Sequence, residues 1–124
     1  MPILRQNFEE LGLPVGPYTH AVSQGTMLFT SGFTAFGTDA QSGSAAEQTD
    51  AILKQLDFIA REHGKSLEDL VKVTVFFTDP DDIPGIREAL TNGYGDAVPA
   101  SSLVLVAGLF SPELRVEIEG VFAL

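Results

Sequence analysis

One segment near the end of the chain, residues 114–122, alternates between apolar and other residues. A period of two sends successive side chains to opposite faces of a β-strand. The apolar set is Val116, Ile118, Gly120 and Phe122, and the opposite set is Arg115, Glu117, Glu119 and Val121. Such a strand is buried on one face only, so the chain has to supply a sheet and a layer that covers the apolar face.

The segment that follows Ser44 repeats its apolar residues every three to four positions, which predicts a helix. Ser44 and Glu47 fit a capping box, in which each side chain binds a backbone N–H that would otherwise lack a partner. Gly64 suits the left-handed position that ends a helix. The predicted apolar stripe consists of Ile52, Leu53, Leu56, Ile59 and Ala60.

Four further segments are predicted to be strands. Residues 21–23 and 26–31 are short and flank a glycine-containing turn. Residues 71–78 are β-branched and alternate, and residues 101–107 are rich in Leu and Val. We expect one face of the strand at residues 71–78 to be buried. This face carries Val71, Val73, Val75 and Phe77.

Asp82-Ile83-Pro84 predicts the start of a short second helix, with the aspartate as its cap and the proline in its first turn. The predicted order is strand, strand, helix, strand, helix, strand, strand. This order is typical of an α+β domain with a mixed β-sheet and two helices on one face. A large apolar sheet face is unfavourable in water, so the bare face favours self-association. That face would carry Phe76, part of the Leu103 and Leu105 strand, and the Glu117 and Glu119 strand.

The chain of 124 residues has the size of one domain, residues 1–124. Its formal charge of −10 would repel a phosphate backbone, so nucleic-acid binding is disfavoured. Cysteine is absent and the only histidines are His20 and His63, which excludes thiolate chemistry and a multi-histidine metal site. No apolar run approaches the roughly 20 residues that span a bilayer, and no signal peptide is recognisable. We therefore expect a cytoplasmic protein without a membrane segment.

Several segments resemble, in order and spacing, the motifs of the Rid (YjgF/YER057c/UK114) superfamily. They are Gly16-Pro17-Tyr18 with His20-Ala21, Phe29-Thr30-Ser31-Gly32, Val71 to Phe76, Pro99-Ala100 with residues 102–109, and Val116-Glu117-Ile118-Glu119. The resemblance extends over almost the whole chain. It implies a chorismate-mutase-like fold and a homotrimer with small-molecule clefts between neighbouring subunits.

The resemblance also implies hydrolysis of reactive imines or enamines, the best-known activity of the family, without a metal or an organic cofactor. In those enzymes the residues at the positions of Tyr18, Ser31 and Gly32 line the cleft, and a glutamate of the last strand helps to place and activate water. An arginine after the Pro-Ala pair clamps the substrate carboxylate through two parallel hydrogen bonds. Ser101 stands at that position, so the sequence argues against a standard 2-imino acid deaminase.

Other residues around the expected cleft also depart from the family pattern. Phe33 stands where glutamine is frequent and Leu103 where cysteine is common, and both predict a more apolar wall. Arg87 replaces a frequent asparagine. We interpret Arg87 either as a relocated clamp for an anion or as a solvated helix arginine. Ser101 would hydrogen-bond a neutral polar ligand.

Glu119 is the predicted general base or water-orienting carboxylate; the alternative is a solvated strand glutamate paired with a cation such as Arg115. Glu117 shares its face and is expected to be structural. Tyr18 would offer its hydroxyl to a substrate carbonyl or imine, or would pack at a subunit boundary with its tip in water. His20 is expected to be a hydrogen-bonded structural residue.

Two hypotheses on function follow. The first is a cofactor-independent enzyme that acts on an imine, an enamine or a related unstable nitrogenous metabolite lacking the α-carboxylate. The second is a non-catalytic ligand-binding or regulatory trimer that binds a small metabolite or a partner enzyme. The two hypotheses are distinguished by whether Arg87 and Glu119 meet in one cleft. Ribonuclease activity, attributed to some members of the family, fits the acidic charge least.

Overall fold

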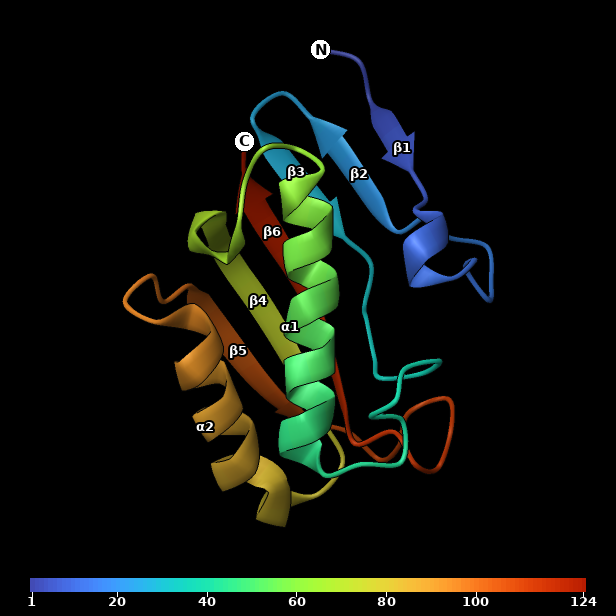
Figure 1. The fold of residues 1–124 in the computed structure, drawn as a ribbon, viewed down its shortest axis with the longest axis vertical. Helices are drawn as coiled ribbons and strands as arrows, with labels where there is room; N and C mark the ends of the chain where they lie inside the picture. The colour runs from blue at the N-terminus through green and yellow to red at the C-terminus, as the bar shows by residue number, and fades with distance from the viewer.

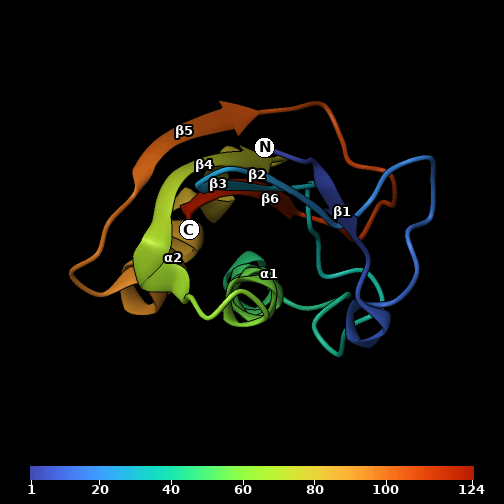
Figure 2. The ribbon, with the colours of Figure 1, turned by 90° about the horizontal axis from the view of Figure 1, so that it is seen from above.

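The computed structural model describes residues 1–124 as a six-stranded mixed sheet with two helices on one face (Figure 1 and Figure 2). The strands are β1 (Leu4–Gln6), β2 (Ala21–Gln24), β3 (Met27–Thr30), β4 (Leu70–Phe77), β5 (Ala100–Leu105) and β6 (Val116–Ala123). The helices are α1 (Ala45–Arg61) and α2 (Ile83–Tyr94), and short 3₁₀ turns lie at Glu9–Leu11, Leu67–Asp69 and Pro80–Asp82. The prediction of an α+β fold with both helices on one face is confirmed.

The sheet has the strand order β1-β2-β3-β6-β4-β5, in which only the β4–β5 pair is parallel. The predicted order of elements was wrong at the N-terminus, because it lacked β1. This strand has three residues, too few for a period of two to be recognised, and it is defined by its pairing. Leu4 pairs with Ser23, and Gln6 pairs with Ala21.

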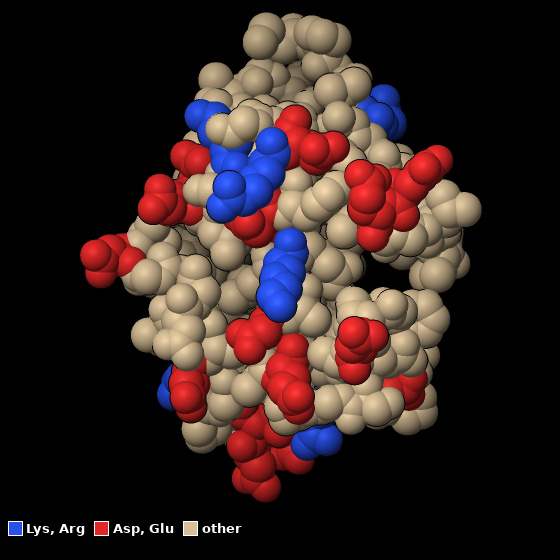
Figure 3. Space-filling view, viewed as in Figure 1, with Lys and Arg blue, Asp and Glu red and all other residues tan.

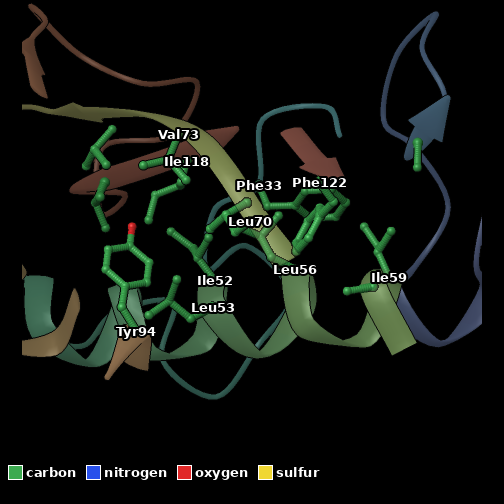
Figure 4. Packing of buried hydrophobic residues seen from close by; sticks show 14 of the residues in the cluster. Phe33, Ile52, Leu53, Leu56, Ile59, Leu70, Val73, Tyr94, Ile118 and Phe122 are labelled. Carbon is green, nitrogen blue, oxygen red and sulfur yellow. The ribbon is translucent and has the colours of Figure 1, made fainter. Parts of the chain in front are cut away.

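The core lies between the two helices and the sheet. Val116, Ile118 and Phe122 of β6 are fully buried, as the alternation predicted. The apolar stripe of α1 packs against them, with Ile52 and Leu56 also fully buried (Figure 4). The strongest local pattern of the sequence therefore marks the central strand of the covered face.

Both ends of α1 are as predicted. The Ser44 hydroxyl accepts the Glu47 N–H at 3.1 Å, and the Glu47 carboxylate accepts the Ser44 N–H at 2.9 Å. After the helix, Gly64 adopts a φ of 71°, the left-handed region that favours glycine. These signals are local, so they do not depend on what packs against the helix.

The first residues of β4 depart from the predicted alternation. The pairing with β6 shifts between Leu70 and Lys72, which is the mark of a β-bulge. Leu70 is consequently buried, while Val71 is 41% exposed, so the prediction that Val71 faces the core was wrong. Beyond the bulge Val73 and Val75 are fully buried, as predicted.

The second helix begins at Ile83, but its predicted cap was wrong. The Asp82 side chain makes no capping hydrogen bond. It instead accepts two hydrogen bonds from the Arg115 guanidinium, at 2.9 and 3.1 Å. A two-bond contact between opposite charges is stronger than a single bond to a backbone N–H. Asp79 caps the preceding 3₁₀ turn by accepting the Asp81 N–H at 2.9 Å.

The face of the sheet opposite the helices is uncovered, and β5 is exposed along its whole length (Figure 2). The parallel register pairs Ser102 with Thr74 and Val104 with Phe76, on the uncovered face. Leu103 and Leu105 pair with the buried Val75 and Phe77, on the helix side, where they remain 37% and 55% exposed. The part of this strand on the bare face is therefore Ser102 and Val104, because register with β4 decides which way the side chains of an edge strand point. None of the helices is long and apolar enough to cross a lipid bilayer.

Candidate functional site

A hollow of about 430 Å³ lies where three segments far apart in sequence meet: the loop before β2, the residues after β3, and β6 with the loop that precedes it. It brings together three predicted site residues, Tyr18, Ser31 and Gly32, with Glu117. Its other lining residues are Val15, Gly16, Pro17 and Phe110. Glu117 was expected to be structural, so the structure changes which carboxylate faces the predicted tyrosine.

Hydrogen bonds at the end of β3 hold the loop that carries Tyr18. The Ser31 hydroxyl donates to the carbonyl of Thr19, and the Ser31 N–H donates to the carbonyl of His20 at 2.9 Å. The Tyr18 hydroxyl accepts the Val15 N–H at 3.3 Å, which leaves its own proton available to a ligand. Ser31 therefore positions the loop, while Tyr18 keeps a free donor at the hollow.

Glu117 and Gly32 are in intimate contact. A Cβ atom on Gly32 would lie 2.5 Å from one Glu117 carboxylate oxygen, so a larger residue here would require the Glu117 side chain to move. Burial raises the pKa of Glu117 above its ordinary value, and the negative charge of Glu119 raises it further. A carboxyl in this state keeps its proton at higher pH than an ordinary glutamate does.

Glu119 lies in a different hollow. Its neighbours there are Phe29, Thr30, Lys72, Thr74, Gly120 and Val121. The Lys72 ammonium donates to the Ser102 hydroxyl at 2.9 Å, and Arg115 is paired with Asp82. The predicted alternative of a Glu119–Arg115 pair was therefore wrong, and Glu119 is an exposed carboxylate without an ion-pair partner in this chain.

Arg87 and Glu119 do not meet in one cleft of a single chain. Arg87 is exposed on α2, which packs on the helix side of the sheet, whereas Glu119 faces the other side. Ser101 and Leu103 lie on the exposed edge strand β5 and line neither of the two hollows.

Phe33 is a core residue that also reaches a hollow. Its side chain is buried in the core (Figure 4), and its backbone exchanges two hydrogen bonds with that of Ile118, at 2.9 and 3.0 Å. Its ring lies 5.5 Å from that of His20, and both contribute to a smaller hollow beside Tyr18.

His20 is a buried structural residue, as predicted. Its Nδ1 accepts the Phe8 N–H at 3.0 Å, and burial lowers its pKa, which favours the neutral ring. In the whole chain, no three acidic or histidine side chains converge in a way that suits a metal ion.

Comparison with known proteins gives a consistent result. A family model described as endoribonuclease L-PSP matches residues 10–124. A RutC family protein of Pyrococcus abyssi is 30% identical over 116 residues, which cover 91% of either chain. The 2-iminobutanoate/2-iminopropanoate deaminase of Salmonella typhimurium is 32% identical over 86% of this chain and 87% of its own length. The crystal structure of Rv2704 from Mycobacterium tuberculosis, a member of the YjgF/YER057c/UK114 family, has a TM-score of 0.76 at 29% identity and matches over 86% of both chains.

Proposed function

The chain belongs to the YjgF/YER057c/UK114 family, and from this premise we propose that it hydrolyses an imine or enamine in clefts between the subunits of a homotrimer. The observation that carries the proposal is the half-buried Glu117 carboxyl, with its raised pKa, in the hollow that Tyr18 and Gly32 also line. Glu117 takes the role that the sequence had assigned to Glu119.

Hydrolysis of an imine requires a proton for the nitrogen and a water molecule for the carbon. A protonated Glu117 donates its proton to the nitrogen while the water oxygen bonds to carbon and the C=N π electrons move onto nitrogen. The resulting carboxylate takes a proton from the added water, which gives a neutral carbinolamine. In the second step Glu117 protonates the amino group, the C–N bond breaks and ammonia leaves. The hydroxyl proton returns to Glu117 as the C=O bond forms.

Tyr18 and Gly32 supply the other polar groups of the hollow. The Tyr18 hydroxyl has a free proton, and the Gly32 N–H donates to no other backbone group of the chain. Two such donors are suited to orient the bound molecule in the hollow. Neither requires a cofactor.

The homotrimer is supported by the uncovered side of the molecule. Phe29 on β3 and Val104 on β5 are exposed on this side, and β5 is an edge strand that is exposed along its whole length. An apolar surface of this kind favours association with further copies of the chain. Ser101 and Leu103 would then face a neighbouring subunit. Light scattering tests this step, and a stable monomer would remove the intersubunit cleft.

The substrate proposed here lacks an α-carboxylate. Within one chain, no Lys or Arg lines the Glu117 hollow and Arg87 lies on the other side of the sheet, while Ser101, at the position of the family's clamping arginine, has no charge. Figure 3 shows basic and acidic side chains interspersed over the helix-covered face, without a continuous basic track for RNA.

The test compares two imines that are generated during the assay. An amine oxidase produces an imine without a carboxylate, and an amino acid oxidase produces an imine with one. Semicarbazide then traps the imine that remains, so that its amount can be measured. We expect this protein to remove the uncarboxylated imine and to leave the carboxylated imine almost unchanged. Glu117→Gln should lower the rate by about 100-fold or more, the usual range for a lost general acid. Glu119→Gln, two residues away on the same face, serves as the matched control and should lower it by less than about tenfold.

The other outcomes are equally informative. If Glu119→Gln abolishes the activity and Glu117→Gln does not, the proton-transfer role belongs to Glu119. If neither imine disappears faster with the protein, the proposal is wrong, and the non-catalytic ligand-binding trimer becomes the better hypothesis.

A further inference from the structure

The hollow that contains Glu117 continues into two more hollows. A small one shares Val15, Tyr18, Gly32 and Phe110 with it. A third shares Leu11, Leu13, Val15, Phe36 and Gln55 with the small one. We call these three connected hollows the apolar groove. Figure 3 shows a deep gap on the right of the molecule, where Figure 1 places the N-terminal segment opposite the loops that follow β3 and β5.

Two aromatic rings stand where the groove leaves the Glu117 hollow. Phe36 and Phe110 come from different loops, and their centroids are 5.1 Å apart with the planes at 65°. The side chains are 45% and 59% exposed, although such rings are favoured inside a core. An edge-to-face pair held at the surface offers a ready contact for a third ring.

The groove is lined by acidic side chains but by no basic ones. Its ionisable carboxylates are Glu117 at one end and Glu10 at the other, and no Lys or Arg lines any of its three parts. His20, which also lines the groove, has a lowered pKa because it is buried. An anion in the groove would meet no basic side chain of this chain, whose formal charge is −10.

We infer that the substrate is an uncharged or cationic imine that carries an aromatic group, with this group on the Phe36–Phe110 pair and the C=N end at Glu117. This inference rests on the proposed function, because it names the substrate class of the same site. Phe36 and Phe110 are then the residues that determine specificity. Glu117, Tyr18 and Gly32 contact only the polar C=N end of the substrate.

Binding of stable amides tests the inference without any catalytic step. Phenylacetamide has an aromatic group and a neutral planar end, propionamide lacks the ring, and phenylacetate replaces the amide with a charge. The full-length protein in its native assembly is titrated with each compound by calorimetry at pH 7. We expect phenylacetamide to bind about three- to tenfold more tightly than propionamide, the range that one aromatic contact gives. Phenylacetate should bind more weakly than its amide.

Substitutions assign the effect to the groove. Phe110→Ala should remove the preference for phenylacetamide, and Phe110→Tyr should retain it because the ring remains. Val98→Ala truncates an apolar side chain that is 70% exposed and lies outside the groove, so it should change nothing. Light scattering on each variant checks that the assembly is unaltered.

Three results would overturn the inference. They are equal binding of the two amides, tighter binding of phenylacetate, and a Phe110→Ala variant that loses its assembly, which would mean that another copy of the chain occupies the groove. Failure of the proposed function looks different: the amide preference persists, while the semicarbazide assay finds no imine hydrolysis. Conversely, hydrolysis of small imines without any amide preference would leave the function standing and the substrate class wrong.

Discussion

The two faces of the sheet are built by the same strands but have opposite properties. On β6, Ile118 and Phe122 are fully buried under the helices, whereas Glu117 and Glu119 face the uncovered side. The covered face contains the apolar contacts that stabilise the fold. The uncovered face carries the polar groups and the exposed apolar residues to which we assign chemistry and association. One strand can serve both purposes because its side chains alternate.

A second contrast lies within the uncovered face. Glu117 and Glu119 are two residues apart, yet they lie in different surroundings. Glu117 is packed against Gly32, and burial raises its pKa. Glu119 is exposed, beside Thr74 and the Lys72–Ser102 pair. Two carboxylates on the same face of one strand can therefore have different environments, because the neighbouring strand and loop determine what each side chain contacts.

The largest effect should come from the covered face. Ile118→Ala removes a fully buried side chain at the centre of the core and should lower the free energy of unfolding by about 3 kcal/mol. Val121→Ala, on the other face of the same strand, should lower it by less than about 1 kcal/mol. Denaturant titration at two protein concentrations measures both. Only the Val121 effect should depend on concentration if that face associates, and equal losses would contradict the contrast between the faces.

A smaller effect, and one that depends on pH, is expected for Glu117→Gln. A carboxyl whose pKa is raised on folding binds its proton more tightly in the folded state, so it lowers stability as the pH rises from 4.5 through the raised value. The amide cannot ionise. The variant should therefore gain stability relative to the wild type between pH 4 and pH 7, by less than the Ile118→Ala loss. A difference that is flat with pH would show that the pKa of Glu117 is the same in both states.

The smallest effect concerns Tyr94, whose ring packs in the core between α2 and the sheet (Figure 4). Its hydroxyl is buried without a hydrogen-bond partner, and burial raises its pKa to about 12. Tyr94→Phe removes the unpaired group and keeps the ring, so it should raise the free energy of unfolding by about 0.5 kcal/mol. Thermal unfolding measures the change. A loss of 1 kcal/mol or more would show that the hydroxyl has a partner, such as a buried water.

Most predictions from local signals agree with the structure, and those that depend on a distant partner often do not. The Asp82 cap is an exception among the local signals, because the distant Arg115 binds its carboxylate. The Ser44–Glu47 capping box and Gly64 lie within or next to one helix, so neighbouring residues suffice to recognise them. Val71 was placed wrongly because a bulge is a property of two paired strands. The family motifs contain both Glu117 and Glu119, and they did not indicate which of the two lies in the hollow with Tyr18.

The sequence by itself determined the α1 helix and the inward face of β6, because each depends on the spacing of residues along one segment. It also determined the acidic charge of the chain and the absence of cysteine, which depend on composition alone. Only the tertiary structure decided that Glu117 lies against Gly32 and that Phe36 meets Phe110. Each of these pairs joins segments far apart in the chain. Strand order, register and loop course set their distances, and the local pattern of side chains does not record them.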